Sequence, residues 1–183
     1  MQPRIREVLT YLDAQFDALR TAFESVPREK RDDSPAPGAW SPAGIIEHLA
    51  IVETSIGRLI SQRVAAGREA GVGPETEDAS VVETFAYANA VLDRTRKIVS
   101  GERSHPTQLW SEAAWQAFDT AHADLRAAVV SADGLALGEI VHPHPVFGPL
   151  NLYHWIAFVG GHEARHAEQI REAGSQAAAF GAQ

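Results

Sequence analysis

Apolar side chains recur every three or four residues along most of this chain, which is the spacing of one face of an α-helix. This spacing predicts a first helix over residues 4–26, ended by Pro27. A second helix is predicted to begin sharply, because Ser41 is a good N-cap and Pro42 suits the first helical position. We expect it to run to about Ala66. The apolar face of the first helix comprises Ile5, Val8, Leu9, Leu12, Phe16, Leu19 and Phe23.

Three further stretches are predicted to be helical. The first two cover roughly residues 80–99 and 108–131. The last begins after Asn151, which can cap it, and runs to about Ala173, where Gly174 is expected to stop it. The buried stripe of the helix over 108–131 is expected to contain Leu109, Trp115, Phe118, His122, Leu125 and Val129.

Glycine and proline mark the connections between these helices. The segment Gly67–Asp78 holds three glycines, a proline and four acidic residues, so we predict a mobile connection there. Residues 132–150 are predicted to be irregular, because Pro143, Pro145 and Pro149 exclude a long helix. Residues 175–183 are rich in alanine, glycine and glutamine and are expected to form a flexible C-terminal tail.

The pattern as a whole predicts an all-α protein. The sequence has no internal repeat and no alternation long enough for a useful strand. A chain of 183 residues is long enough for one compact domain, which we place at residues 1–174. Several long amphipathic helices with short links predict a helical bundle.

Composition narrows the classes of function. The formal net charge is −8 and the basic residues are scattered, which disfavours a nucleic-acid partner. There is no cysteine, so neither a disulfide nor a thiolate ligand is available. No apolar stretch is long enough to span a bilayer, and the N-terminus lacks the apolar segment of a secretory signal. A cytoplasmic protein without a membrane partner is therefore expected.

Three histidines form the candidate site. His162 and His166 stand four residues apart, which places them about 40° apart around a helix and about 6 Å apart along it. Such a pair can share one ion, although two surface histidines near a helix end would have the same spacing. His48 lies between Ile45 and Val52 on an apolar face of the second helix. It is either a core histidine or a third ligand brought in by bundle packing.

Three neutral imidazoles around a divalent ion leave at least one position for water or substrate, as in catalytic sites. Imidazole suits Zn, Ni, Co, Fe and Cu, so the ligand type does not choose the metal. Zn or Ni is the expected ion, with Fe, Co or Mn as alternatives. Gln169 falls on nearly the same helical face as His162 and His166, so it can orient an imidazole or a water. Further candidates for the pocket lining are Asn151, Trp155 and Trp40.

The remaining polar residues near these positions are expected to have other roles. His142 and His144 lie in a loop and are predicted to be exposed, although the loop can cover the site. His105 is expected in a loop, His122 in the core, and His154 about 80° around the helix from His162. Two acidic neighbours of the ligands, Glu47 and Glu163, are turned about 100° away and are predicted to be solvated or salt-bridged.

The chain resembles the DinB/YfiT-like superfamily of metal-binding helix bundles. Three short segments, in this order, carry the resemblance, which runs over nearly the whole chain: Trp40-Ser41 with His48-Leu49, the loop His144–Leu150, and the segment His162–Ile170. The family's three metal ligands map onto His48, His162 and His166. The resemblance implies an up-down-down-up four-helix bundle, often a homodimer, here with an additional helix, long loops and the Gly67–Asp78 insertion.

Members of this family include thiol-dependent enzymes that use mycothiol or bacillithiol, others are named as hydrolases, and many have no known activity. The first hypothesis for this chain is therefore a metal-dependent S-transferase or hydrolase that activates a low-molecular-weight thiol or water for a small-molecule substrate. The second is a non-catalytic metal- or ligand-binding bundle of a stress response. The third is an interaction module whose histidines are incidental.

Overall fold

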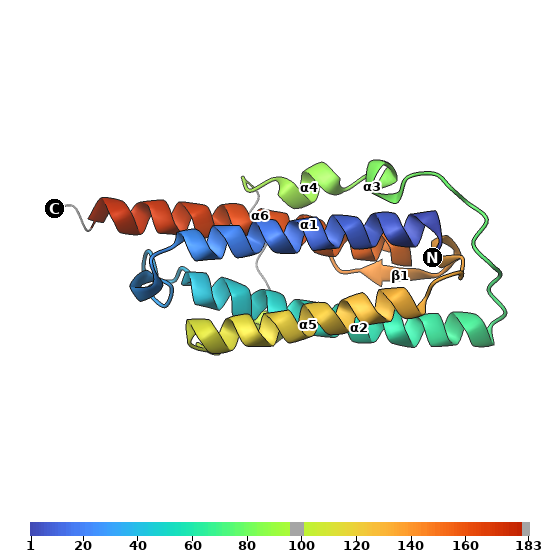
Figure 1. Ribbon diagram of the computed structural model, residues 1–183, viewed down its shortest axis with the longest axis horizontal. Helices are drawn as coiled ribbons and strands as arrows, with labels where there is room; N and C mark the ends of the chain where they lie inside the picture. Colours follow the sequence, from blue (N-terminus) through green and yellow to red (C-terminus); the bar gives the residue numbers. More distant parts are fainter. Residues whose placement is uncertain (96–100, 181–183) are drawn as a thin grey trace.

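Four long helices form the body of the protein in a computed structural model that describes residues 1–95 and 101–180. They are α1 (Pro3–Ser25), α2 (Pro42–Glu69), α5 (Ser111–Ser131) and α6 (Leu152–Phe180). In Figure 1, α1 lies beside α6 and both run in one direction, whereas α2 lies beside α5 and both of these run in the opposite direction. This arrangement is an up-down-down-up four-helix bundle, as predicted.

Short elements complete the fold. Two short helices, α3 (Val81–Thr84) and α4 (Ala88–Leu92), lie against α1 and α6 (Figure 1). Three 3₁₀ turns lie at Arg28–Lys30, Glu102–Ser104 and Leu137–Glu139. None of the helices within the described ranges is long and apolar enough to cross a membrane.

Side-chain caps fix the starts of the helices that carry the site. The hydroxyl of Ser41 accepts a hydrogen bond from the amide of Gly44 at 3.0 Å, at the beginning of α2. The side chain of Asn151 accepts one from the amide of His154 at 2.9 Å, at the beginning of α6. Both caps satisfy amides that have no partner inside the helix. The phase of each helical face is therefore set within its first turn.

The segment predicted to be irregular contains a β-hairpin. Strand β1 (Val141–His144) pairs antiparallel with β2 (Gly148–Asn151), so the expectation of no strand is wrong here. Proline was the reason for excluding regular structure, but each strand of a two-stranded ribbon has a free edge that tolerates it. The hairpin leads directly into α6 and buries His144 and Leu150.

Helices α1 and α6 approach each other closely at Gly160, on α6. A Cβ atom there would lie 2.4 Å from Cε1 of Tyr11, on α1, so only glycine fits without displacing the ring. The Tyr11 ring therefore packs directly against the backbone of α6 at this level. This contact holds α6 at a fixed rotation about its axis, two residues before His162.

Two helix boundaries differ from the sequence prediction. The helix expected at 80–99 is broken into α3 and α4, because the chain turns extended at Phe85 and buries that ring; residues 96–99 lie outside the described part. Helix α6 continues past Gly174 to Phe180. A Cβ at Gly174 would lie 3.1 Å from the side chain of Val26, so this glycine serves packing rather than termination.

The connection after α2 is shorter and better held than predicted. Helix α2 runs on to Glu69, so the first residues of the expected connection Gly67–Asp78 are helical. The backbone of Gly73 and Glu75 then hydrogen-bonds to the segment Gly134–Ala136 at the far end of α5. Arg4 pairs with the Glu75 carboxylate at 3.2 Å. This connection lies about 30 Å along α2 from His48, given the 1.5 Å rise per residue.

The third long helix also begins later than predicted. Helix α5 starts at Ser111, whose amide donates to the carboxylate of Asp32 at 2.8 Å. An acidic group at this end of a helix is favourable. Leu109 therefore lies before the helix and is exposed, whereas the rest of the predicted stripe from Phe118 onward is buried.

Candidate metal centre

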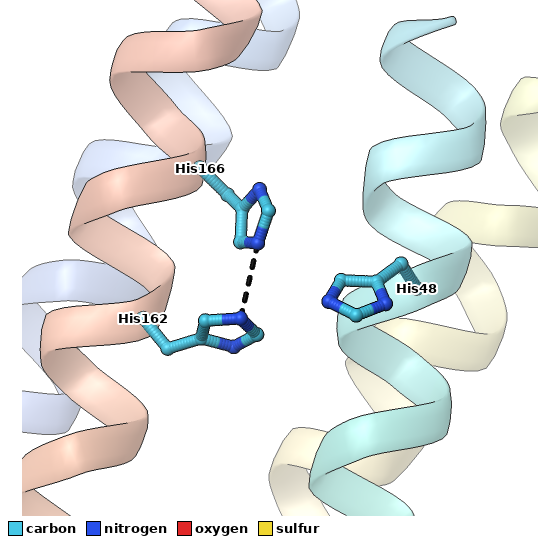
Figure 2. A group of neighbouring side chains, drawn as sticks. All are labelled: His48, His162 and His166. Carbon is cyan, nitrogen blue, oxygen red and sulfur yellow. Dashed lines mark hydrogen bonds between the residues drawn. The ribbon is translucent and has the colours of Figure 1, made fainter. Parts of the chain in front are cut away.

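Three imidazoles from two helices converge between α2 and α6 (Figure 2). His48 lies in the second turn of α2, whose rotation the Ser41 cap sets. His162 and His166 lie one turn apart on α6, and both rings point towards His48. One ligating nitrogen from each of the three rings lies within 4.8 Å of the others. The predicted convergence of two helices is therefore present.

The spacing of these nitrogens fits a single shared ion. The Nε2 atoms of His162 and His166 are 3.0 Å apart. At metal–nitrogen distances of 2.0–2.1 Å, neighbouring ligands at tetrahedral or octahedral angles lie about 3.0–3.4 Å apart. The centroid of the His48 ring lies 5.3 Å from that of His162 and 5.1 Å from that of His166. The three rings therefore enclose a position that each can reach with one nitrogen.

Hydrogen bonds outside the cluster select the tautomer of two rings. The Nδ1 of His48 lies 2.7 Å from the carbonyl oxygen of Ser104, which can only accept, so this nitrogen carries the proton. The Nδ1 of His166 lies 2.8 Å from Oε1 of Gln169. In both rings the Nε2 lone pair is then left for the cluster. This arrangement, with a carbonyl behind each ligand, is the usual second layer of histidine metal sites.

The environment keeps these rings uncharged. Burial is the largest cause, because a charged ring loses its hydration in this surrounding. Burial and the neighbouring His48 lower the pKa of His166 to about 3. The pKa of His162 lies well below its usual value for the same reasons, and burial lowers the pKa of His48. Neutral imidazole is the form that ligates a metal, so no ring has to lose a net proton. With Nδ1 of His166 protonated, the proton of the Nε2–Nε2 hydrogen bond lies on His162, and it must move to Nδ1 of His162 before both Nε2 atoms can ligate.

Glu47 supports the site from the neighbouring loop. The carboxylate of Glu47 accepts hydrogen bonds from the amide and hydroxyl of Thr107, at 2.7 and 2.6 Å, and from the amide of Leu109 at 2.9 Å. Burial opposes its ionisation, but these donors outweigh burial and lower the pKa of Glu47. The prediction of a solvated or salt-bridged Glu47 is therefore wrong. It anchors the loop that presents the Ser104 carbonyl to His48.

Aromatic rings form the wall around the histidines. The Trp40 ring lies 4.8 Å from that of His48, and Phe158 stacks on His162 at 5.4 Å. Trp40 also lines a cleft of about 920 Å³, together with His105 and residues of the 34–38 and 105–110 loops. None of the three histidines lines this cleft, so Trp40 is the residue that contacts both the cluster and the cleft.

His144, like Glu47, has surroundings that differ from the prediction. It was predicted to be exposed, but it is buried on the hairpin, 4.5 Å from the Phe158 ring and 4.7 Å from the Trp155 ring. Its Nδ1 accepts hydrogen bonds from the amides of Val146 and Phe147, at 3.1 and 3.3 Å. Burial lowers the pKa of His144 to about 4. The ring is thus neutral, with its Nε2 protonated.

The other predicted pocket residues lie at different distances from the cluster. Trp155 is buried behind His144 and donates its indole N–H to the carbonyl of His142 at 3.1 Å. Asn151 is occupied as the cap of α6, about 16 Å along the helix from His162. His154 packs against Phe85, which agrees with its predicted direction away from the site.

A second buried cluster lies beside the first. Glu163, predicted to be solvated or salt-bridged, is fully buried with Glu53 and His122. Its carboxylate lies 3.4 Å from Nδ1 of His122, so the salt-bridge alternative describes it and the solvated one does not. His122 is a core residue, as predicted. The sequence gave no signal that Glu163, on the same helix as His162, meets residues of α2 and α5.

Comparison with known proteins identifies the family and supports the fold. The chain is 28% identical over 147 residues to "Uncharacterized protein YuaE" of Bacillus subtilis (strain 168), covering 79% of this chain and 83% of that protein. A solved structure, "Crystal structure of TT2238, a four-helix bundle protein", covers 92% of this chain and 98% of its own with a TM-score of 0.55 and 23% identity. The profile of the DinB superfamily matches residues 11–170, which is most of the sequence. The chain belongs to the DinB superfamily.

Proposed function

We propose that this protein is a metal-dependent enzyme whose ion is held by His48, His162 and His166. The observation that carries the proposal is the convergence of three neutral imidazoles, two of which have their Nδ1 atoms committed to outer oxygens. A divalent ion held by three histidines lowers the pKa of a bound water or thiol and supplies a nucleophile near neutral pH. Zn or Ni is the expected ion, with Fe, Co or Mn as further possibilities.

Different residues of the chain would hold the ion, orient its ligands and exclude water. His48 and His166 hold the ion and are themselves held by Ser104 and Gln169, which limits rotation of their rings. His162 is more exposed than His48 and His166, because it is only partly buried. The open coordination position of the ion is therefore expected on the side of His162. Rings of Trp40 and Phe158 exclude bulk water around the cluster.

We infer a small electrophile as substrate, with a low-molecular-weight thiol or water as the second reactant. The chain contains no cysteine, so any thiol must come from a cosubstrate. The cleft beside Trp40 is large enough for such a molecule, since small-ligand pockets measure about 300–1,000 Å³. A homodimer, a cytoplasmic location and the absence of a nucleic-acid partner are further parts of this proposal, supported by the family resemblance and the net charge of −8.

A non-catalytic metal-binding protein is the second candidate, and one observation favours it. His48 is only 4% exposed and His166 only 7%, so substrate has limited access to the ion. In that case the metal would contribute free energy of folding without supporting a reaction.

The decisive experiment combines metal analysis with turnover. Untagged protein is purified in chelator-free, nickel-free buffer, and its metal content is compared with that of His48→Ala and His162→Ala. The matched control is His154→Ala, which removes an imidazole of α6 that faces Phe85. We expect about one ion per chain in the wild type and the control, and a large loss in both ligand variants. Full occupancy in His48→Ala would exclude that residue as a ligand.

Turnover separates the two candidates. Conjugation of bacillithiol or mycothiol to a chromogenic nitroaryl halide, and hydrolysis of a chromogenic ester, are followed with and without a chelator. An enzyme predicts a rate that disappears with the metal and is absent in His162→Ala. A binding protein predicts equal background rates, together with a lower melting temperature in the chelator.

A further inference from the structure

The core of the bundle contains a second set of potential ligands on three helices. Glu53 comes from α2, His122 from α5 and Glu163 from α6. Both glutamates are 0% exposed, and His122 is 6% exposed. One ligating atom from each lies within 4.8 Å of the other two. Two carboxylates and an imidazole are therefore enclosed together in an apolar core.

The distances within this set suit direct coordination. The Nδ1 of His122 lies 3.2 Å from Oε2 of Glu53 and 3.4 Å from Oε1 of Glu163. Ligands at about 2.0–2.2 Å from a common ion are separated by about 3.0–3.4 Å. The imidazole is also held in place, because it stacks on Phe16 with centroids 4.4 Å apart. Its Nδ1 thus faces both carboxylates.

The oxygens of the two glutamates point to a missing partner. Within the described residues, both oxygens of Glu163 and Oε1 of Glu53 are buried without a hydrogen bond. A buried oxygen in this condition costs free energy, and a buried carboxylate costs more. A cation would satisfy these lone pairs together. A single imidazole cannot, because its Nδ1 carries at most one proton.

Charge indicates the kind of cation. Once loading has released the cluster's protons, two carboxylates with a neutral imidazole carry a charge of −2, which one divalent ion balances, whereas the three-histidine set brings no charge of its own. Carboxylate ligands suit Mn, and imidazole with carboxylate suits Fe(II), more than the all-imidazole set does. The two sets also face apart: Glu53 lies five residues after His48, about 140° around α2, and Glu163 lies about 100° around α6 from His162.

We propose that Glu53, His122 and Glu163 form a second divalent metal site, oxygen-rich and buried in the bundle, that takes Mn(II) or Fe(II). It is independent of the three-histidine site, because no residue is shared. Its ion would link α2, α5 and α6, which come from the two helix pairs of the bundle. It is closed to solvent, so loading is expected during folding.

The test uses Mn(II), whose electron paramagnetic resonance reports its ligands. The chain is unfolded in urea with a chelator, refolded with excess Mn(II), desalted and analysed for metal. In the His48→Ala/His162→Ala background, which lacks the first site, we expect about one Mn(II) per chain. Its spin-echo modulation should show coupling to a single nitrogen, that of His122. Adding Glu53→Gln and Glu163→Gln should remove this ion, with folding checked by circular dichroism.

Each outcome decides the proposal. Absence of Mn(II) in the background variant, coupling to more than one nitrogen, or unchanged Mn(II) after both glutamine substitutions would overturn it. If the combined variant does not fold, Glu53→Gln alone in the wild-type chain should lose the single-nitrogen signal, and its retention contradicts the assignment. The first site is scored separately by zinc content. If the wild-type protein bound no zinc at the three histidines but kept the Mn(II) signal with coupling to a single nitrogen, only the proposed function would be rejected.

Discussion

The two buried clusters share helices α2 and α6, the second adds His122 from α5, and their histidines have opposite electrostatic surroundings. At the three-histidine cluster, the outer partners of His48 and His166 are neutral oxygens of Ser104 and Gln169. At the other cluster, His122 faces the carboxylates of Glu53 and Glu163. Burial disfavours a charged ring in both places.

The consequence is a wide separation of pKa values for one type of side chain. Burial, unopposed by any anion, lowers the pKa of His166 to about 3. Burial acts on His122 as well, but the two glutamates outweigh it and raise the pKa to about 10. Burial and the nearby Glu53 in turn raise the pKa of Glu163 well above its usual value. The nearest charged groups, rather than the depth of burial, decide which histidine can offer a lone pair at neutral pH without metal.

Removal of the protonated His122 side chain from the second cluster should have the largest effect on stability. His122→Leu in metal-free protein leaves Glu53 and Glu163 buried without a counter-charge, and breaking such a pair costs about 3–5 kcal/mol. Urea unfolding at pH 7.5 measures the loss. Adding Glu53→Gln and Glu163→Gln removes the uncompensated charge and should restore most of it. A loss below about 1 kcal/mol, the ordinary cost of a point substitution, would show that the carboxylates are already neutral or solvated.

Removal of an outer partner should weaken the first cluster by a smaller amount. Gln169→Ala frees the Nδ1 of His166, and loss of such a partner reduces metal affinity by about 10- to 100-fold. Competition with a chromophoric chelator measures this affinity. Glu168→Ala is the matched control, since Glu168 is the adjacent side chain and pairs with Arg171. Equal affinities in the two variants would argue that the hydrogen bond to Gln169 does not orient the ring.

Local sequence signals predicted the parts of the fold that local interactions determine. The Ser41 and Asn151 caps and the long amphipathic stripes gave the four main helices. The failures are positions where distant contacts outweigh local preference. Gly174 has the chemistry of a helix stop, yet Val26 of another helix occupies the space beside it. Phe85 leaves a helical pattern because its burial against the bundle stabilises the extended turn.

The candidate site was predictable to the extent that helical spacing defines faces. Spacing placed His162, His166 and Gln169 together, and the apolar flanks of His48 turned it inward. It could not show that Glu163, one residue away, meets residues of two other helices. Nor could it place His144, because the hairpin that buries this ring depends on pairing rather than on periodicity.

Acid should destabilise the protein through its neutral histidines. The folded pKa values of His166 and His144, about 3 and about 4, lie below the ordinary histidine pKa of 6.5. Below pH 6.5 the unfolded chain binds protons that the folded chain does not. Stability is therefore fully present above pH 6.5 and falls as the pH decreases, by up to about 1.4 kcal/mol per pH unit for each histidine.

The second cluster predicts the opposite dependence of stability on pH, so the plot of stability against pH has an acid limb and an alkaline limb. The folded pKa of His122 is about 10, so its contribution is present below pH 6.5 and is lost as the pH rises towards 10. Urea unfolding of metal-free protein between pH 4.5 and 9.5 measures both limbs. His144→Phe should flatten the acid limb only. An acid limb that is unchanged in this variant would contradict the low pKa assigned to His144.

The smallest effect is expected at Asn151, which lies at the start of α6 and away from the three imidazoles. Asn151→Ala removes the acceptor for the amide of His154, and loss of such a cap costs about 1 kcal/mol. Asn151→Asp keeps the acceptor and should retain stability in urea unfolding. Metal content should be unchanged in both variants, because the rotation of α6 at His162 is also fixed by the contact of Gly160 with Tyr11. A loss of metal in Asn151→Ala would instead mean that the cap sets the direction of the ligands, and that the packing of α6 on α1 does not hold them by itself.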